Sequence, residues 1–172
     1  MRKRTMFSEI AYAGVLTAFT LVFIYIAGVF PGGRLSILCL TTAVGAFVLM
    51  DTHFRFWLVH YAAAALLGLL VAPNVLIALP YVLIFGNYAA IKYACECMRN
   101  RVLEYACKCV YFAGMGYLTY SICKSVLLSD NMIDIAWYIV LPISIGIGVL
   151  FDFALTGVIK LYSSRIRNWI RK

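Results

Sequence analysis

The sequence predicts an all-α fold: a polytopic membrane bundle of six transmembrane helices, forming one domain over residues 1–172, with both termini in the cytoplasm. Three observations predict it. The chain is 65% hydrophobic and 13% charged, whereas a soluble domain is about 25% charged. Long apolar segments recur along the whole chain, separated by only a few polar residues. Lysine and arginine gather in alternate connections between those segments.

Each predicted span has about the length with which a helix crosses the hydrocarbon core of a bilayer, roughly 20 residues. The first segment is too long for the core of a signal peptide and no cleavage site follows it, so we expect it to be retained. The second is the shortest of the six. The third carries His53 and His60 on one face. The spans are predicted at residues 9–30, 35–50, 54–71, 75–94, 105–128 and 135–160.

The fourth, fifth and sixth segments carry the polar residues of interest. The fourth begins with the apolar run VLIALPYVLI and then contains Asn87, which needs a partner helix or a ligand. The fifth follows a basic connection. The sixth, PISIGIGVLFDFALTG, can kink at Pro142 and its glycines, and its Asp152 is the only acidic residue well inside a span.

The distribution of basic residues predicts the orientation. With the N-terminus inside, all of the 15 lysines and arginines except Arg34 and Lys124 fall on the cytoplasmic side. The net charge of +8 is then explained by topology and by contact with the anionic head groups of the bilayer. We therefore expect a multi-pass protein of the cell membrane that binds no nucleic acid.

Four charged residues near the inner ends of the fourth and fifth spans are spaced for mutual pairing. Lys92 and Glu96 lie one helical turn apart, and Glu104 and Lys108 repeat that spacing. A hairpin centred near Asn100 would place 92 opposite 108 and 96 opposite 104. We expect a charge network that fixes the hairpin. The alternative is a docking surface for a cytoplasmic partner.

Four of the six cysteines flank the same turn, in the stretch CECMRNRVLEYACKC. A zinc site needs thiolates that converge on one point, but helical residues two apart point about 200° away from each other. We therefore expect no metal site. In a reducing compartment these cysteines are expected to act as small buried hydrophobic residues rather than as a disulfide.

Enzymatic activity is not expected. The chain contains no nucleophile elbow, zinc-binding H-E-x-x-H helix or P-loop. One carboxylate inside a span cannot supply both partners of an acid–base pair. No cofactor is implied by any motif.

Two sets of residues point to binding instead. Small residues at four-residue spacing on the first span, namely Ala13 with Thr17 and Gly14 with Ala18, allow another helix to approach closely, either within the bundle or from a partner. Polar and aromatic residues gather at the outer ends of the spans. Among these, Arg34 is an outer cation suited either to bind an anion or to extend to the interface.

The chain resembles the substrate-binding S components of energy-coupling-factor (ECF) transporters. The resemblance rests on the six-span topology, on IAYAGVLTAFTLVFIYIAGVFPGGRLSILCL, and on LPYVLIFGNYAAIKYACE and FDFALTGVIKLY. It implies that the small residues of the first span face a coupling membrane subunit, which works with ATPases. The strict Ala-x-x-x-Ala pattern of that family is missing here. The resemblance also implies an outer pocket near Arg34, Asn74, Tyr81 and Trp137.

These features lead to two functional hypotheses. The first is a membrane-embedded capture subunit of a multi-subunit importer for a small polar or anionic nutrient, with Arg34, Asn74, Tyr81, Asn87 and Trp137 as candidate substrate-binding residues. The second is a non-transporting scaffold or assembly protein that binds a partner through its first helix and basic inner face. An outward cavity with convergent polar groups would favour the first, and a solidly packed bundle the second.

Overall fold

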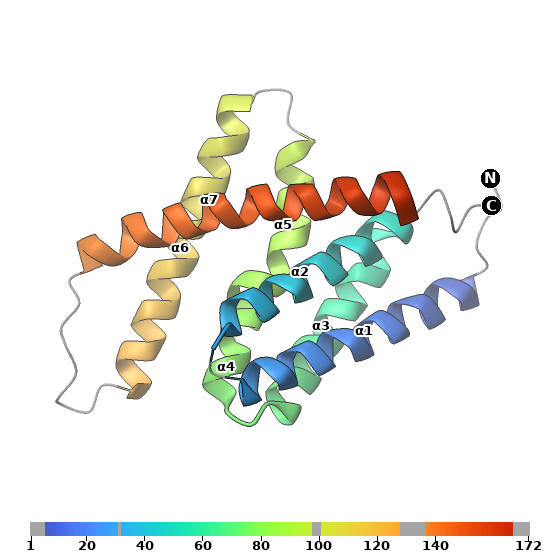
Figure 1. Ribbon diagram of the computed structural model, residues 1–172, viewed down its shortest axis with the longest axis horizontal. Coiled ribbons are helices and arrows are strands. Elements are labelled where there is room, and N and C mark those ends of the chain that lie inside the picture. The colour runs from blue at the N-terminus through green and yellow to red at the C-terminus, as the bar shows by residue number, and fades with distance from the viewer. Residues whose placement is uncertain (1–5, 31, 98–100, 128–136, 167–172) are drawn as a thin grey trace. The chain divides into compact units, whose positions relative to one another are not determined.

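The computed structural model describes residues 6–30, 32–97, 101–127 and 137–166, and every regular element within them is helical. Figure 1 shows their order. The elements are α1 (Met6–Val29), α2 (Arg34–Asp51), α3 (Phe54–Val71), α4 (Val75–Pro80), the π-helical turn η1 (Tyr81–Phe85), α5 (Gly86–Glu96), α6 (Arg101–Leu127), α7 (Trp137–Leu161) and a second π-helical turn, η2 (Tyr162–Ile166). The all-α prediction is confirmed for these residues.

Four helical stretches are long and apolar enough to cross a membrane: α1, α2, α3 and Pro142–Ser164. The predicted span 75–94 is not among them because it is divided among α4, η1 and α5. The predicted span 105–128 corresponds to α6, which is long enough but is less apolar, since it carries Arg101, Glu104, Lys108 and Lys124. A membrane-spanning class is thus supported, and the number of crossings stays a prediction.

The helices extend past several predicted span ends. α1 begins at Met6 and α6 at Arg101, whereas the predicted spans begin at residues 9 and 105. The reason is that a helix can continue into a polar region while its hydrophobic segment stops, because its backbone hydrogen bonds are internal. Residue 128 and residues 135–136 of the predicted spans lie outside the described residues.

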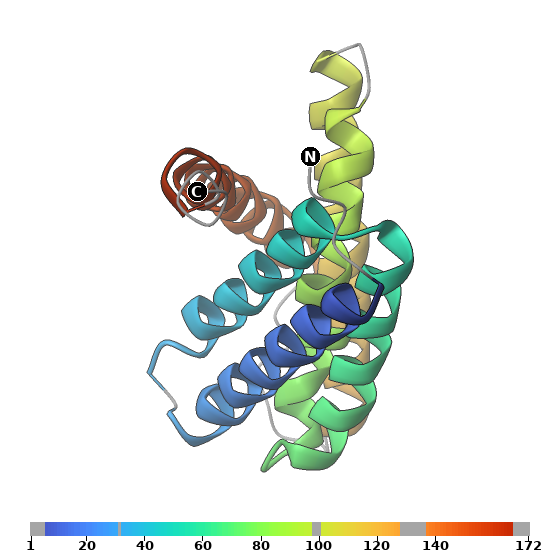
Figure 2. The ribbon, with the colours of Figure 1, turned by 90° about the vertical axis from the view of Figure 1, so that its right-hand side faces the viewer.

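The chain forms two compact units. Unit 1 comprises Met1–Ala90 with Val158–Lys172, and unit 2 comprises Ile91–Gly157. The chain passes between them inside α5 and inside α7, so neither boundary falls at a linker, and the single domain stays a prediction. Within unit 1, α1, α2 and α3 lie side by side in both views (Figures 1 and 2). Ala13, Val48 and Trp57 from these three helices form a buried cluster.

Two turns at one end of unit 1 are defined by local chemistry. Gly33 precedes α2 with φ of 96°, a left-handed conformation that glycine adopts without a Cβ clash. Asn74 caps α4, where its side-chain Oδ1 accepts a hydrogen bond from the Leu76 amide at 2.9 Å. The end of α1 is close to the second turn, because a Cβ on Gly28 would lie 2.5 Å from Pro73.

The π-helical turn η1 follows Pro80, which has no amide hydrogen to donate to the preceding turn. Hydroxyls from neighbouring helices satisfy two of its carbonyls. Tyr61 of α3 donates to the Val82 carbonyl, and Thr42 of α2 donates to the Phe85 carbonyl, each at 2.8 Å. In an apolar bundle such side-chain donors stabilise a helix whose regular hydrogen bonding is interrupted.

Unit 2 consists of the end of α5, α6 and most of α7. Gly148 allows α7 to pack closely on α6, because a Cβ there would lie 2.3 Å from the Phe112 ring. Phe112 also meets Phe151 edge to face, with ring centroids 6.4 Å apart. This contact leads directly to Asp152.

Candidate functional site

The centre of unit 2 is a buried carboxylate held by two lysines. Lys92 Nζ of α5 donates to Asp152 Oδ1 at 2.5 Å, and Lys108 Nζ of α6 donates to Asp152 Oδ2 at 3.0 Å. Lys92 is 3% exposed, Lys108 4% and Asp152 9%. Asp152 therefore links all three helices of unit 2 through charged hydrogen bonds, which are stronger than neutral ones.

Two glutamates complete the cluster from the sides. Lys92 lies 2.9 Å from Glu96, and Lys108 lies 2.7 Å from Glu104 and 3.9 Å from Glu96. We call these five residues, Lys92, Glu96, Glu104, Lys108 and Asp152, the charge network. The Glu96 side chain is 46% exposed, so this carboxylate is the solvated edge of an otherwise buried group.

Helical periodicity explains most of this arrangement. Each lysine lies four residues from its glutamate on the same helix, so each pair forms locally. The structure brings together the four residues singled out from the sequence. The sequence argument missed that Asp152 is shared between both lysines. The available signal was that a lone carboxylate within an apolar helix needs a cation.

The electrostatics of the charge network favour a functional role. Two lysines and three carboxylates are gathered in a poorly solvated environment, where replacing ion pairs by apolar residues is often neutral or stabilising. Lys92 Nζ also donates to the Thr156 hydroxyl at 2.7 Å, so polar groups surround this ammonium. A network of this kind can hold three helices in one arrangement and release them when one charge is neutralised.

Unit 1 contains a buried histidine with a free ring nitrogen. His60 of α3 is 2% exposed, and its Nδ1 lies 2.8 Å from the Thr17 hydroxyl of α1. Because Thr17 uses its only hydrogen to donate to the Ala13 carbonyl, its oxygen accepts the hydrogen of His60 Nδ1. In the neutral imidazole Nε2 is then an acceptor, and it has no partner in the part of the chain described.

Trp57, about one turn before His60 on α3, also has a buried ring nitrogen without a partner among the described residues. Its indole Nε1 is a donor that is buried and lacks a partner among the described residues. The ring is 3% exposed and stacks on Tyr61 with centroids 5.8 Å apart. The core of unit 1 therefore contains one donor and one acceptor that the described protein groups do not satisfy.

A third polar cluster lies at the end of unit 1 opposite the α1–α2 turn. The Asp51 carboxylate at the end of α2 accepts hydrogen bonds from the hydroxyls of Tyr12, at 3.0 Å, and Tyr162. Tyr162, which begins η2, is 6% exposed and stacks on Phe47 with ring centroids 4.0 Å apart. These contacts attach the C-terminal part of unit 1 to α1 and α2.

The candidate substrate-binding residues do not gather at one point. Arg34 and Asn74 are exposed at the same end of unit 1, whereas Tyr81 is buried at 1% exposure. Asn87 is half-buried and lies near the Tyr61 hydroxyl of α3, a neighbouring helix. Trp137 is the first residue of α7, and its side chain lies outside the described residues.

The small residues of α1 divide into two faces. Ala13 and Thr17 are buried at 6% and 9% exposure and face the core of unit 1. Gly14 and Ala18 are exposed, and a Cβ on Gly14 would meet no atom within 4 Å. The second pair is thus the one available to a partner helix.

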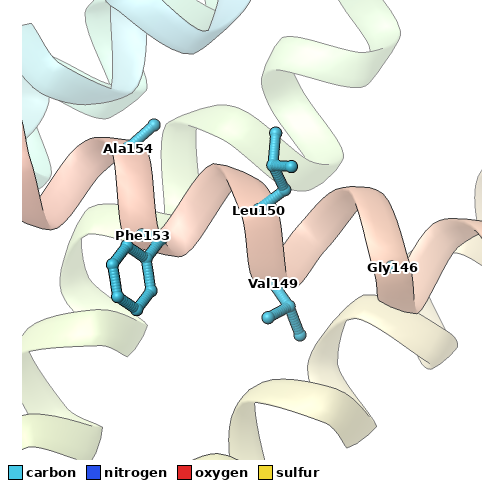
Figure 3. A pocket seen from close by; sticks show the side chains of 5 residues that line it. All are labelled: Gly146, Val149, Leu150, Phe153 and Ala154. Carbon is cyan, nitrogen blue, oxygen red and sulfur yellow. The ribbon is translucent and has the colours of Figure 1, made fainter.

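A shallow apolar depression of about 500 Å3 lies along α7. Figure 3 shows its lining residues along this one helix. The lining residues are Gly146, Val149, Leu150, Phe153 and Ala154. Such a surface suits lipid or an apolar helix rather than a polar solute.

The cysteines near the α5–α6 connection are free thiols. Cys95 is buried, Cys97 is exposed, and Cys107 and Cys109 are partly accessible. Among the residues described, no group of three or more histidine, cysteine or acidic side chains is placed to hold a metal ion.

Comparison with known proteins gives no relative: no family model, no curated protein and no solved structure matches the chain.

Proposed function

We propose that this chain is a six-span protein of the cell membrane with both termini in the cytoplasm, and that it captures a small polar or anionic solute for a multi-subunit importer. The alternation of basic and non-basic connections supports this topology. Four helical stretches of sufficient length and apolarity support the membrane location.

The unsatisfied polar groups of unit 1 carry the capture proposal. Trp57 Nε1 and His60 Nε2 are a donor and an acceptor, three residues apart on α3 and buried in an apolar core. Leaving such a group without a partner costs on the order of 1–3 kcal/mol, so a small polar molecule that bonds to them stabilises the folded protein. In this proposal Arg34, at the outer end, attracts an anionic solute.

Native mass spectrometry of the purified protein tests this proposal. We expect a co-purified small molecule in the wild type, and a loss of about tenfold or more in its occupancy in Trp57→Phe, which removes the unpartnered N–H and keeps most of the ring. The stability of the solute-free protein should be nearly unchanged, because the removed donor has no partner among the described residues.

Tyr61→Phe is the matched control, because this hydroxyl donates to a backbone carbonyl. It should reduce stability and leave solute occupancy unchanged. Arg34→Ala should lower occupancy without affecting the fold, since Arg34 is exposed. A wild-type spectrum without any bound molecule would contradict capture.

One observation favours the scaffold function as a second candidate. Arg34, Asn74 and Tyr81 do not share a pocket among the described residues, since Arg34 and Asn74 are exposed and Tyr81 is buried. A scaffold would use the exposed Gly14–Ala18 face of α1. If the chain is a scaffold, a membrane protein should co-purify with the wild type and be lost from Gly14→Leu. No solute should bind to the wild type or to Gly14→Leu.

A further inference from the structure

The buried indole N–H of Trp57 lies beside room for one small group. Trp57 is 3% exposed, and its Nε1 has no partner among the described residues. A Cβ on Gly45 of α2 would lie 3.7 Å from this nitrogen and 3.8 Å from the Ala89 Cβ of α5. Both distances are ordinary van der Waals contacts, so a methyl-sized group fits between these three residues, which all belong to unit 1.

The chemistry of the surrounding residues determines what this space can hold. The indole nitrogen is only a donor, so its partner must be an acceptor. Gly45 and Ala89 have no polar side-chain atoms, and Ala89 is 3% exposed. The cations of unit 1 whose side chains the structure describes are all exposed: Arg34, Arg55 and Lys160. A carboxylate or phosphate beside Trp57 would therefore exchange its hydration for one neutral hydrogen bond, which is too little to offset the burial of a charge.

We propose that the space between Trp57, Gly45 and Ala89 binds an uncharged oxygen group of the captured solute, either a carbonyl or a hydroxyl. This inference rests on the capture function proposed above, and it names the class of group that the core of unit 1 recognises. The oxygen accepts the Trp57 N–H, and the small residues on α2 and α5 leave room for it. A solute that carries a negative charge must keep that charge outside this space.

Gly45→Ala tests the space directly. The added methyl would occupy the place of the oxygen without a clash, because its nearest atoms are 3.7 and 3.8 Å away. We expect the occupancy of the co-purified solute, measured by native mass spectrometry, to fall by about tenfold or more.

Two controls separate loss of binding from loss of folding. Alanine favours a helix more than glycine does, so solute-free Gly45→Ala should unfold at the same denaturant concentration as the wild type or at a higher one. Gly14→Ala is the matched glycine variant, because a Cβ there would meet no atom within 4 Å. It should keep the solute occupancy of the wild type.

Acetamide and acetate test the charge of the bound group, because the two molecules have nearly the same size and shape. The readout is the Trp57 indole N–H signal in a proton–nitrogen correlation NMR spectrum of the dialysed full-length protein in detergent. Trp57→Phe identifies this signal by its loss. Molecules this small bind with dissociation constants of about 1 mM or weaker. We expect acetamide to shift the signal at a concentration about tenfold lower than acetate does, and Gly45→Ala to abolish the shift.

The results that would overturn this inference differ from those that would contradict capture. Acetate acting at an equal or lower concentration, neither probe shifting the Trp57 signal, or wild-type occupancy in Gly45→Ala would each overturn it. So would a co-purified solute whose oxygens all belong to ionised groups. The capture function would stand in these cases if the wild type carries a solute. A wild type without a solute would contradict both proposals, even if Gly45→Ala moved the Trp57 signal by displacing a water molecule.

Discussion

The two units bury polar groups in different ways. The core of unit 1 uses neutral groups: the Thr17 hydroxyl meets His60, and the Thr42 hydroxyl meets a backbone carbonyl. Unit 2 uses full charges, with two lysines around Asp152. Two neutral nitrogens of unit 1 have no partner among the described residues, whereas each buried lysine of the charge network contacts at least two carboxylates.

The difference follows from the free energy of desolvation. A neutral donor or acceptor without a partner costs about 1–3 kcal/mol, which a folded bundle tolerates at single positions. An isolated buried charge costs several kcal/mol even after relaxation. A unit with charged groups must therefore satisfy all of them together, and a unit with neutral groups keeps some capacity for a ligand.

Asp152→Asn should have the largest effect on stability. It keeps the shape of the side chain and removes the charge that Lys92 and Lys108 share. We expect a loss of about 3–5 kcal/mol in the free energy of unfolding, because breaking a buried ion pair leaves the lysines poorly compensated. Unfolding in mild detergent titrated with sodium dodecyl sulfate measures it.

Glu96→Gln is the control, because Glu96 is 46% exposed and also pairs with Lys92. Its expected loss is about 0–1 kcal/mol. Combining Asp152→Asn with Lys92→Met should restore part of the lost stability, since one unpaired cation is removed. Equal losses for Asp152→Asn and Glu96→Gln would mean that the network is solvated, and the contrast between the units would disappear.

Thr17→Val tests the neutral side of the comparison. The substitution removes the acceptor of His60 Nδ1 and keeps the volume and β-branching of the side chain. We expect a loss of about 1–3 kcal/mol in unfolding free energy.

Thr20→Val is a matched control on the same helix. Thr20 is 0% exposed and, like Thr17, donates to the carbonyl four residues earlier, but it has no histidine partner among the described residues. It should lose less than about 1 kcal/mol, because that carbonyl keeps its helical hydrogen bond. Equal stability losses for Thr17→Val and Thr20→Val would show that the hydrogen bond between Thr17 and His60 does not contribute to stability.

Apart from the controls, Tyr12→Phe should have the smallest effect on stability. Asp51 keeps the Tyr162 hydroxyl as a donor when Tyr12 is changed, so the carboxylate is not stranded. We expect a loss of about 1 kcal/mol, typical of one hydrogen bond. Tyr25→Phe on the same helix, with 49% of Tyr25 exposed, should change the unfolding free energy by less than half as much. A stability loss in Tyr12→Phe as large as that in Asp152→Asn would mean that the hydrogen bonds around Asp51 contribute as much to stability as the charge network does.

The sequence alone predicts the features that depend on one helix. Composition and the recurrence of apolar segments predict the helical class, and four stretches are apolar and long enough to cross a membrane. The four-residue spacing of Lys92 from Glu96 and of Glu104 from Lys108 places each pair on one face. These inferences need only the periodicity of the α-helix.

The same periodicity explains what the sequence could not predict. The pairs Ala13–Thr17 and Gly14–Ala18 have identical spacing on α1, yet the first faces the core and the second is exposed. In the sequence, Asp152 is a single acidic residue within an apolar run. In the folded protein, Lys92 of α5 and Lys108 of α6 both pair with it. Spacing determines which residues share a face of their own helix, and only packing determines which helix meets that face. The sequence therefore determined the class and the local pairs, and the tertiary structure decided their partners.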